Sequence, residues 1–71
     1  MTDYEEKKYV IEQFNRIIME TSGYDPGYYV DGGDNNNPCI FDKNGNARQS
    51  IACDSPIAVF KDLAKVLQED F

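Results

Sequence analysis

The chain has 71 residues, and its thirteen acidic and seven basic side chains give a formal net charge of −6. A surface of this sign repels nucleic acid and anionic lipid, so neither is expected as a direct partner. The sequence contains no histidine, which removes the most common general base and the most common transition-metal ligand. A chain this short has little room for a pocket, so we expect one domain, residues 1–71, that is not an enzyme and holds no cofactor or metal.

No stretch of the sequence is suited to a membrane or to secretion. No apolar run approaches the roughly 18 residues that a membrane-spanning helix needs. The first ten residues, MTDYEEKKYV, lack the basic-then-apolar order of a secretion signal. The expected location is the cytoplasm, where Cys39 and Cys53 would remain reduced.

Residues 3–21 are predicted to form an amphipathic helix that ends at Gly23, a residue suited to the left-handed conformation. Its start can be capped by Thr2 or Asp3. Apolar side chains recur at helical spacing and form one stripe, which is expected to face the core. This stripe consists of Val10, Ile11, Phe14, Ile17, Ile18 and Thr21.

The segment GYDPGYYVDGGDNNNP, residues 23–38, contains three tyrosines, three aspartates and no basic residue. Residues 27–32, which follow Pro26, are rich in aromatic and β-branched side chains and are predicted to form a short strand. The glycines and asparagines after it are typical of a polar loop. Because side chains alternate along a strand, at most one of Tyr28 and Tyr29 is expected to point into the core.

Residues 39–53 are predicted to form a β-hairpin, for which two registers compete. One has a two-residue turn at Asn44-Gly45 and places Phe41 on the same face as Arg48. The other has a type I turn from Asp42 to Gly45, with the favoured Asp first and Gly fourth, and we expect burial to select it. This second register directs Cys39, Phe41, Ala47, Gln49, Ile51 and Cys53 toward the helices, and directs Ile40, Asp42, Arg48 and Ser50 away from them.

The last helix is predicted to begin after Ser55, a favoured N-cap, with Pro56 at its first position. The resulting order, helix, three strands, helix, predicts an α+β fold. Both helices are expected to cover one face of a three-stranded antiparallel sheet and to leave the other face open. The expected buried stripe of the last helix consists of Ile57, Phe60, Leu63, Ala64, Leu67 and Phe71.

This order of elements resembles that of the double-stranded-RNA-binding domain, and the resemblance is one of topology only. That family carries a basic cluster at the start of its last helix. This chain has CDSPIAVFKD there, with Asp54 and Asp62 beside Lys61. An RNA-binding module is therefore only a third hypothesis for function.

Two further motifs are interpreted as structural. The two cysteines have neither CxxC spacing nor a histidine partner, so they are predicted to be packed thiols rather than nucleophiles or zinc ligands. The stretch DGGDNNN, residues 31–37, offers oxygen donors but lacks the alternating ligands and closing glutamate of an EF-hand. It is interpreted as a loop, and no metal site is predicted.

The tyrosine-rich segment is typical of a recognition surface, because tyrosine gives contact area at low entropic cost. Our first hypothesis is an acidic inhibitor or adaptor that binds a protein with a basic surface, such as a nucleic-acid-binding enzyme. Bacteriophage anti-defence proteins, including anti-CRISPR and anti-nuclease proteins that act in the host cytoplasm, resemble this chain in size and charge. The predicted contact residues are Tyr24, Asp25, Tyr28, Tyr29, Asp31 and Asp34.

The second hypothesis is a small regulatory or structural domain whose acidity serves only solubility. Such a domain could form a homodimer through its open sheet face. The two hypotheses differ in the expected arrangement of carboxylates on the folded surface. Continuous rows at phosphate-like spacing favour mimicry of nucleic acid, and scattered charges favour solubility.

Overall fold

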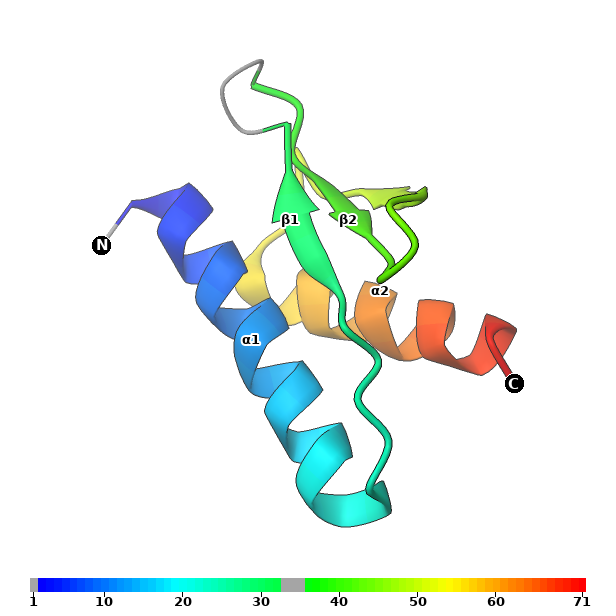
Figure 1. The fold of residues 1–71 in the computed structure, drawn as a ribbon. Coiled ribbons are helices and arrows are strands. Elements are labelled where there is room, and N and C mark those ends of the chain that lie inside the picture. Colours follow the sequence, from blue (N-terminus) through cyan, green and yellow to red (C-terminus); the bar gives the residue numbers. More distant parts are fainter. Residues whose placement is uncertain (1, 33–35) are drawn as a thin grey trace.

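The computed structural model describes residues 2–32 and 36–71 and confirms the predicted α+β fold. Both helices pack on one side of an antiparallel sheet in which β2 is the central strand (Figure 1). Within the described residues, neither helix combines the length and the hydropathy needed to cross a bilayer. The elements are α1 (Asp3–Ser22), β1 (Tyr29–Asp31), β2 (Cys39–Phe41), β3 (Ala47–Ser50) and α2 (Pro56–Glu69).

The helix ends form as the sequence predicts. The Thr2 hydroxyl accepts a hydrogen bond from the backbone N–H of Glu5, which satisfies a free donor of the first turn of α1. Gly23 ends α1 in the left-handed region, with φ 76°. At the start of α2, the Ser55 hydroxyl accepts from the N–H of Ala58.

The hairpin between β2 and β3 has the predicted turn but an additional irregularity. Gly45 has φ 83°, and its N–H donates to the carbonyl of Asp42 at 3.0 Å. Phe41 then pairs with Ala47, as expected, whereas Ile40 pairs with Gln49. Arg48 is therefore an extra residue, and its strand forms a β-bulge.

The predicted hairpin faces are correct for Gln49, Ser50 and Ile51. The bulge makes them wrong for residues 39–42, Ala47 and Arg48. Without the bulge, alternation places Ile40 and Ile51 on opposite faces, so only one of them could be buried. The extra residue Arg48 reverses the alternation, and both isoleucines become fully buried. Arg48 and Asp42 lie on the helix-covered side, whereas Cys39 and Phe41 are only half-buried and Ala47 and Cys53 are exposed.

The core uses only part of the predicted helix stripes. Ile11, Phe14 and Leu63 are buried as expected, but α2 also turns Val59 and Val66 inward. A two-layer domain of this size cannot cover a wider apolar arc on both helices, so the remaining apolar side chains stay at the surface. The predicted core residues of the helices that are instead exposed are Ile17, Thr21, Ile57, Phe60 and Phe71.

One charged side chain, Lys7 of α1, is buried in the core layer. Its ammonium donates to the carbonyl oxygens of Ile51 and Ala52 at 2.9 and 3.3 Å, and it pairs with Asp3 at 2.9 Å. Three acceptors match the three protons of the ammonium, so the charge is compensated. Lys7 thereby ties the end of the hairpin to the first turns of α1.

Candidate functional site

The face of the sheet opposite the helices, which we call the open face, carries a stacked aromatic pair. Tyr29 of β1 lies opposite Phe41 of β2, with ring centroids 5.5 Å apart and planes inclined by 17°. Tyr29 remains 43% exposed. Cross-strand partners share a face, and the open face accordingly consists of Tyr29, Asp31, Cys39, Phe41, Ala47 and Ser50.

Two predicted contact residues, Asp25 and Asp31, present exposed carboxylates before and within β1. Asp31 lies two residues after Tyr29 and therefore on the same face, and its Oδ1 accepts from the N–H of Gly32. Asp25 precedes β1, where its Oδ1 accepts from the N–H of Gly27. Among the described residues, no lysine or arginine forms an ion pair with either carboxylate, so both can accept a partner's cation.

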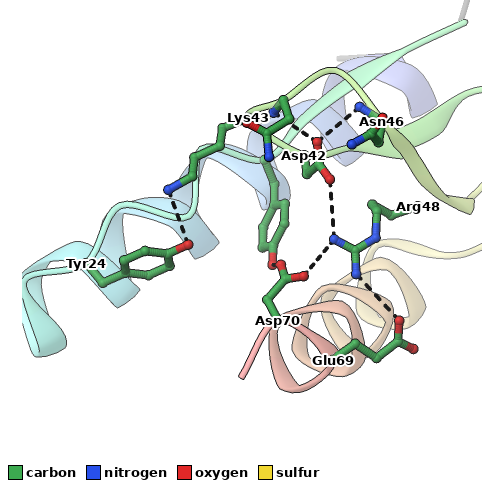
Figure 2. Close-up of polar contacts among 9 residues, drawn as sticks. Tyr24, Asp42, Lys43, Asn46, Arg48, Glu69 and Asp70 are labelled. Atoms are coloured by element: carbon green, nitrogen blue, oxygen red, sulfur yellow. Dashed lines mark hydrogen bonds and ion pairs between the residues drawn. The ribbon is translucent and has the colours of Figure 1, made fainter.

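Tyr24, another predicted contact residue, lies at the flank of the domain and is half-buried. Its ring packs edge-on against Phe71, with centroids 5.4 Å apart. The Lys43 ammonium lies 4.9 Å from the ring centroid and donates to the Tyr24 hydroxyl at 3.4 Å; Figure 2 shows Lys43 extended toward this hydroxyl. Tyr24 thus connects the hairpin turn with the C-terminus.

Tyr28 belongs to the core, which confirms that no more than one of the two adjacent tyrosines points inward. The side-chain amide of Asn15 in α1 binds the backbone of Tyr28 twice. Its oxygen accepts from the Tyr28 N–H, and its nitrogen donates to the Tyr28 carbonyl. The Tyr28 hydroxyl donates to Asp70 at 2.6 Å. Burial, together with this hydrogen bond, raises the pKa of Tyr28 well above its usual range. A ring held in this way is not available to a partner, so the prediction of Tyr28 as a contact residue is wrong.

The last predicted contact residue, Asp34, lies outside the described residues.

Beneath the sheet, Arg48 joins the hairpin to the end of α2. Its guanidinium contacts Asp70 at 2.7 Å, Asp42 at 3.4 Å and Glu69 at 3.6 Å (Figure 2). The backbone N–H of Asn46 and other donors lower the pKa of Asp42. The hydroxyl of Tyr28 and the guanidinium of Arg48 lower the pKa of Asp70. These carboxylates serve the fold, because each already has its donors within the chain.

At the other end of α2, Asp54 and Asp62 form a pair of a different kind. The carboxyl of Asp62 lies within hydrogen-bonding reach of that of Asp54. One oxygen of each, Oδ2, is buried and accepts no hydrogen bond from any described residue. Burial and then the neighbouring carboxyl raise the pKa of Asp62 to about 6. The Asp62 carboxyl therefore keeps its proton to a higher pH than an ordinary aspartate does.

A cavity of about 400 Å³ lies beside the start of α1, between Tyr4, Lys7, Asn36, Pro38 and Ala52. Its one basic side chain, Lys7, already has three acceptors.

Over residues 2–32 and 36–71, no group of three cysteine or acidic side chains is arranged to hold a metal ion. Cys39 and Cys53 are both free, and Cys53 is exposed rather than packed as predicted.

No protein-family model matches the chain, and comparisons with characterised proteins and with solved structures also give no match. The surface itself is therefore the basis for a functional proposal. Of the predicted contact residues, the structure brings Tyr29 and Asp31 together on the open face, with Asp25 before the same strand. It adds Phe41, which the sequence analysis had assigned to the core. One sequence signal could have placed Phe41 correctly. Ile40 and Ile51 are both large apolar residues, and only a register that buries both of them turns Phe41 to the open face.

Proposed function

We propose that this chain is a protein-binding domain whose open face docks on a basic surface of another protein. The observation that carries the proposal is the half-exposed Tyr29–Phe41 stack beside Asp31, a carboxylate without a basic partner among the described residues. A rigid aromatic pair gives contact area at low entropic cost. A lysine or arginine of the partner can lie over the Tyr29 ring while it pairs with Asp31.

The charge of the whole chain supports a basic partner. With a net charge of −6, the domain attracts positively charged surfaces and accelerates their association. Part of the acidity is used within the fold, because Asp3, Glu20, Asp42, Glu69 and Asp70 form ion pairs with basic side chains of the chain. Exposed carboxylates such as Asp31 are those left for a partner.

The finer part of the proposal concerns the partner. A basic surface of the required kind occurs on nucleic-acid-binding enzymes, where the carboxylates of an inhibitor can replace phosphates. A small acidic inhibitor of this kind would suit a bacteriophage that counters host nucleases or CRISPR effectors. Size and charge support this role.

The proposal is tested by affinity capture from bacterial lysate with matched variants. The binding-face variant combines Tyr29→Ala with Asp31→Lys. The control variant combines Tyr9→Ala with Glu12→Lys on α1, where Tyr9 is 53% exposed and thus comparable with Tyr29. We expect a basic protein to be retained by the wild type and the control and lost by the binding-face variant. Equal retention by both variants would reject the open face as the binding surface.

The partner class is tested separately on any purified protein that passes this comparison. Binding is measured with increasing concentrations of duplex DNA or RNA, and at increasing salt. If the domain occupies a nucleic-acid-binding surface, the nucleic acid displaces it, and the association rate falls as salt screens the charges. Displacement by salt but not by nucleic acid would retain the protein-binding role and exclude mimicry of nucleic acid.

A further inference from the structure

The two helices carry more apolar surface than the core uses. Ile57 is 72% exposed, Ile17 is 47% exposed and Phe60 is 45% exposed. Val10 and Ala64, on the same two helices, pack against the core and are only partly buried. Isolated apolar residues are common on protein surfaces, but several large ones on two packed helices of so small a domain indicate a contact surface. We call this set, Val10, Ile17, Ile57, Phe60 and Ala64, the helix seam.

The helix seam lies along both helices, on either side of the point where α1 packs against α2. The rings of Phe14 and Phe60 meet edge to face with centroids 5.5 Å apart, which joins α1 to α2 at this point. Ile17 follows Phe14 by one turn of α1, and Ile57 precedes Phe60 by one turn of α2. On α1, Asn15 lies on the flank that contacts β1, so Ile17, on the opposite flank of Phe14, lies on the side of the helices away from the sheet.

The two edges of the helix seam have opposite charge. On α1, Glu6 and Glu20 lie two heptads apart and border the Val10–Ile17 stripe on its solvent side. Glu6 forms no ion pair with a described residue, whereas Glu20 shares its charge with Arg16 in an exposed pair at 3.0 Å. On α2, Lys61 and Lys65 border Ile57 in the same way. Both lysines are exposed, and neither forms an ion pair within the described part of the chain.

We propose that the helix seam is the contact surface of a two-fold symmetric dimer of this chain. A two-fold axis that runs along the seam places the acidic α1 edge of each copy against the basic α2 edge of the other. The apolar residues of the seam then meet across the axis. Lys61 and Lys65 would repel a basic partner at this surface. A second copy of the chain presents an acidic edge opposite the lysines and a basic edge opposite the glutamates.

The dimer is weak and concentration-dependent, because the seam is small. A stable interface buries about 800 Å² from each partner, which a few side chains on two short helices do not supply. We expect a dissociation constant on the order of 10–100 μM, which dilution reverses. The open face is not used, so both copies can still bind a further protein.

Sedimentation velocity from about 10 μM to about 1 mM tests the dimer. The wild type is expected to shift from monomer to dimer, and Ile57→Glu is expected to remain monomeric throughout. Ile57 is 72% exposed, so its replacement should leave the fold intact. Tyr9→Glu, on an exposed part of α1, and Tyr29→Ala, on the open face, are expected to dimerise like the wild type. A monomeric wild type at all concentrations, or a dimer that only Tyr29→Ala disrupts, would overturn the proposal.

A charge exchange tests the symmetry of the contact. One variant carries Lys61→Glu with Lys65→Glu, so both of its edges are acidic. The other carries Glu6→Lys with Glu20→Lys, so both of its edges are basic. Each variant alone is expected to be monomeric at concentrations where the wild type dimerises, and an equimolar mixture is expected to form a heterodimer. If each variant alone dimerises like the wild type, or the mixture stays monomeric, the proposed pairing of edges is wrong.

Discussion

The two faces of the sheet differ in how far their side chains are buried and in how their charged groups are paired. The helix-covered face encloses Ile40 and Ile51 completely, and Arg48 beside them is held by three carboxylates. The open face carries the Tyr29–Phe41 stack, half in contact with solvent. A single extra residue in β3 decides which side chains belong to which face. Stability is therefore concentrated on one face, which leaves the other free for recognition.

Adjacent residues of β2 provide the strongest test of this difference. We expect Ile40→Ala to lower the free energy of unfolding by about 2–5 kcal/mol, because it leaves a cavity in the core. We expect Phe41→Ala to cost only about 1–2 kcal/mol, from partial burial and the lost stacking with Tyr29. Urea denaturation of the two variants measures both values. A larger loss for Phe41→Ala than for Ile40→Ala would show that the faces are reversed.

Arg48 provides the next test, because the register predicted from the sequence placed it on the open face. Its side chain is only 20% exposed, and Arg48→Gln leaves Asp42 and Asp70 without their basic partner. We expect a clear fall in the melting temperature. Arg16→Gln, which removes an exposed ion pair with Glu20, is the control and should change it little. Equal melting temperatures for the two variants would mean that Arg48 has no structural role.

The sequence was sufficient for the elements but not for the register of the sheet. The caps at Thr2 and Ser55 and the turn at Gly45 are local signals, and each forms as predicted. The bulge at Arg48 is not local, because it depends on the simultaneous burial of Ile40 and Ile51 under the two helices. Periodicity alone could not reveal this requirement.

The helix stripes and the candidate site were predicted in part for a related reason. Both helices have apolar arcs wider than the contact that the sheet offers, so the sequence could not show which part would be buried. Ile57 and Phe60 were assigned to the core and are exposed. In the tyrosine-rich segment, alternation correctly separated Tyr28 from Tyr29. It could not predict Phe41 as the stacking partner, because that contact depends on the register.

Carboxylates on the two sides of the sheet should respond differently to neutralisation. Asp62, on the helix side, has a raised pKa because of burial and Asp54. Asp62→Asn removes this unfavourable charge, and at pH 7.5 we expect it to raise the free energy of unfolding by about 1–2 kcal/mol, allowing for solvent screening. Asp31→Asn, on the open face, should have almost no effect. Chemical denaturation compares the two variants.

The pH dependence gives the sign of the Asp62 effect independently. In the unfolded chain an aspartate titrates near pH 4, and in the folded chain the pKa of Asp62 is about 6. Protonation of Asp62 thus favours the folded state. The stability that the protonated carboxyl contributes is fully present below about pH 4 and is lost as the pH rises through 6. The advantage of Asp62→Asn over the wild type should therefore grow between pH 4 and 7 and vanish in acid. An advantage that is independent of pH would assign the effect to packing instead.

The smallest effect on stability is expected from the variant that should have the largest effect on binding. Tyr29→Ala with Asp31→Lys removes a half-exposed ring and reverses a solvated charge, neither of which the core requires. The lost stacking on Phe41 should lower the free energy of unfolding by only about 0.5–1 kcal/mol. A small shift of the thermal melt together with lost capture of a basic protein would separate recognition from folding. A cooperative loss of structure in this variant would instead mean that the aromatic pair holds the sheet together and that the open face contributes to stability as the covered face does.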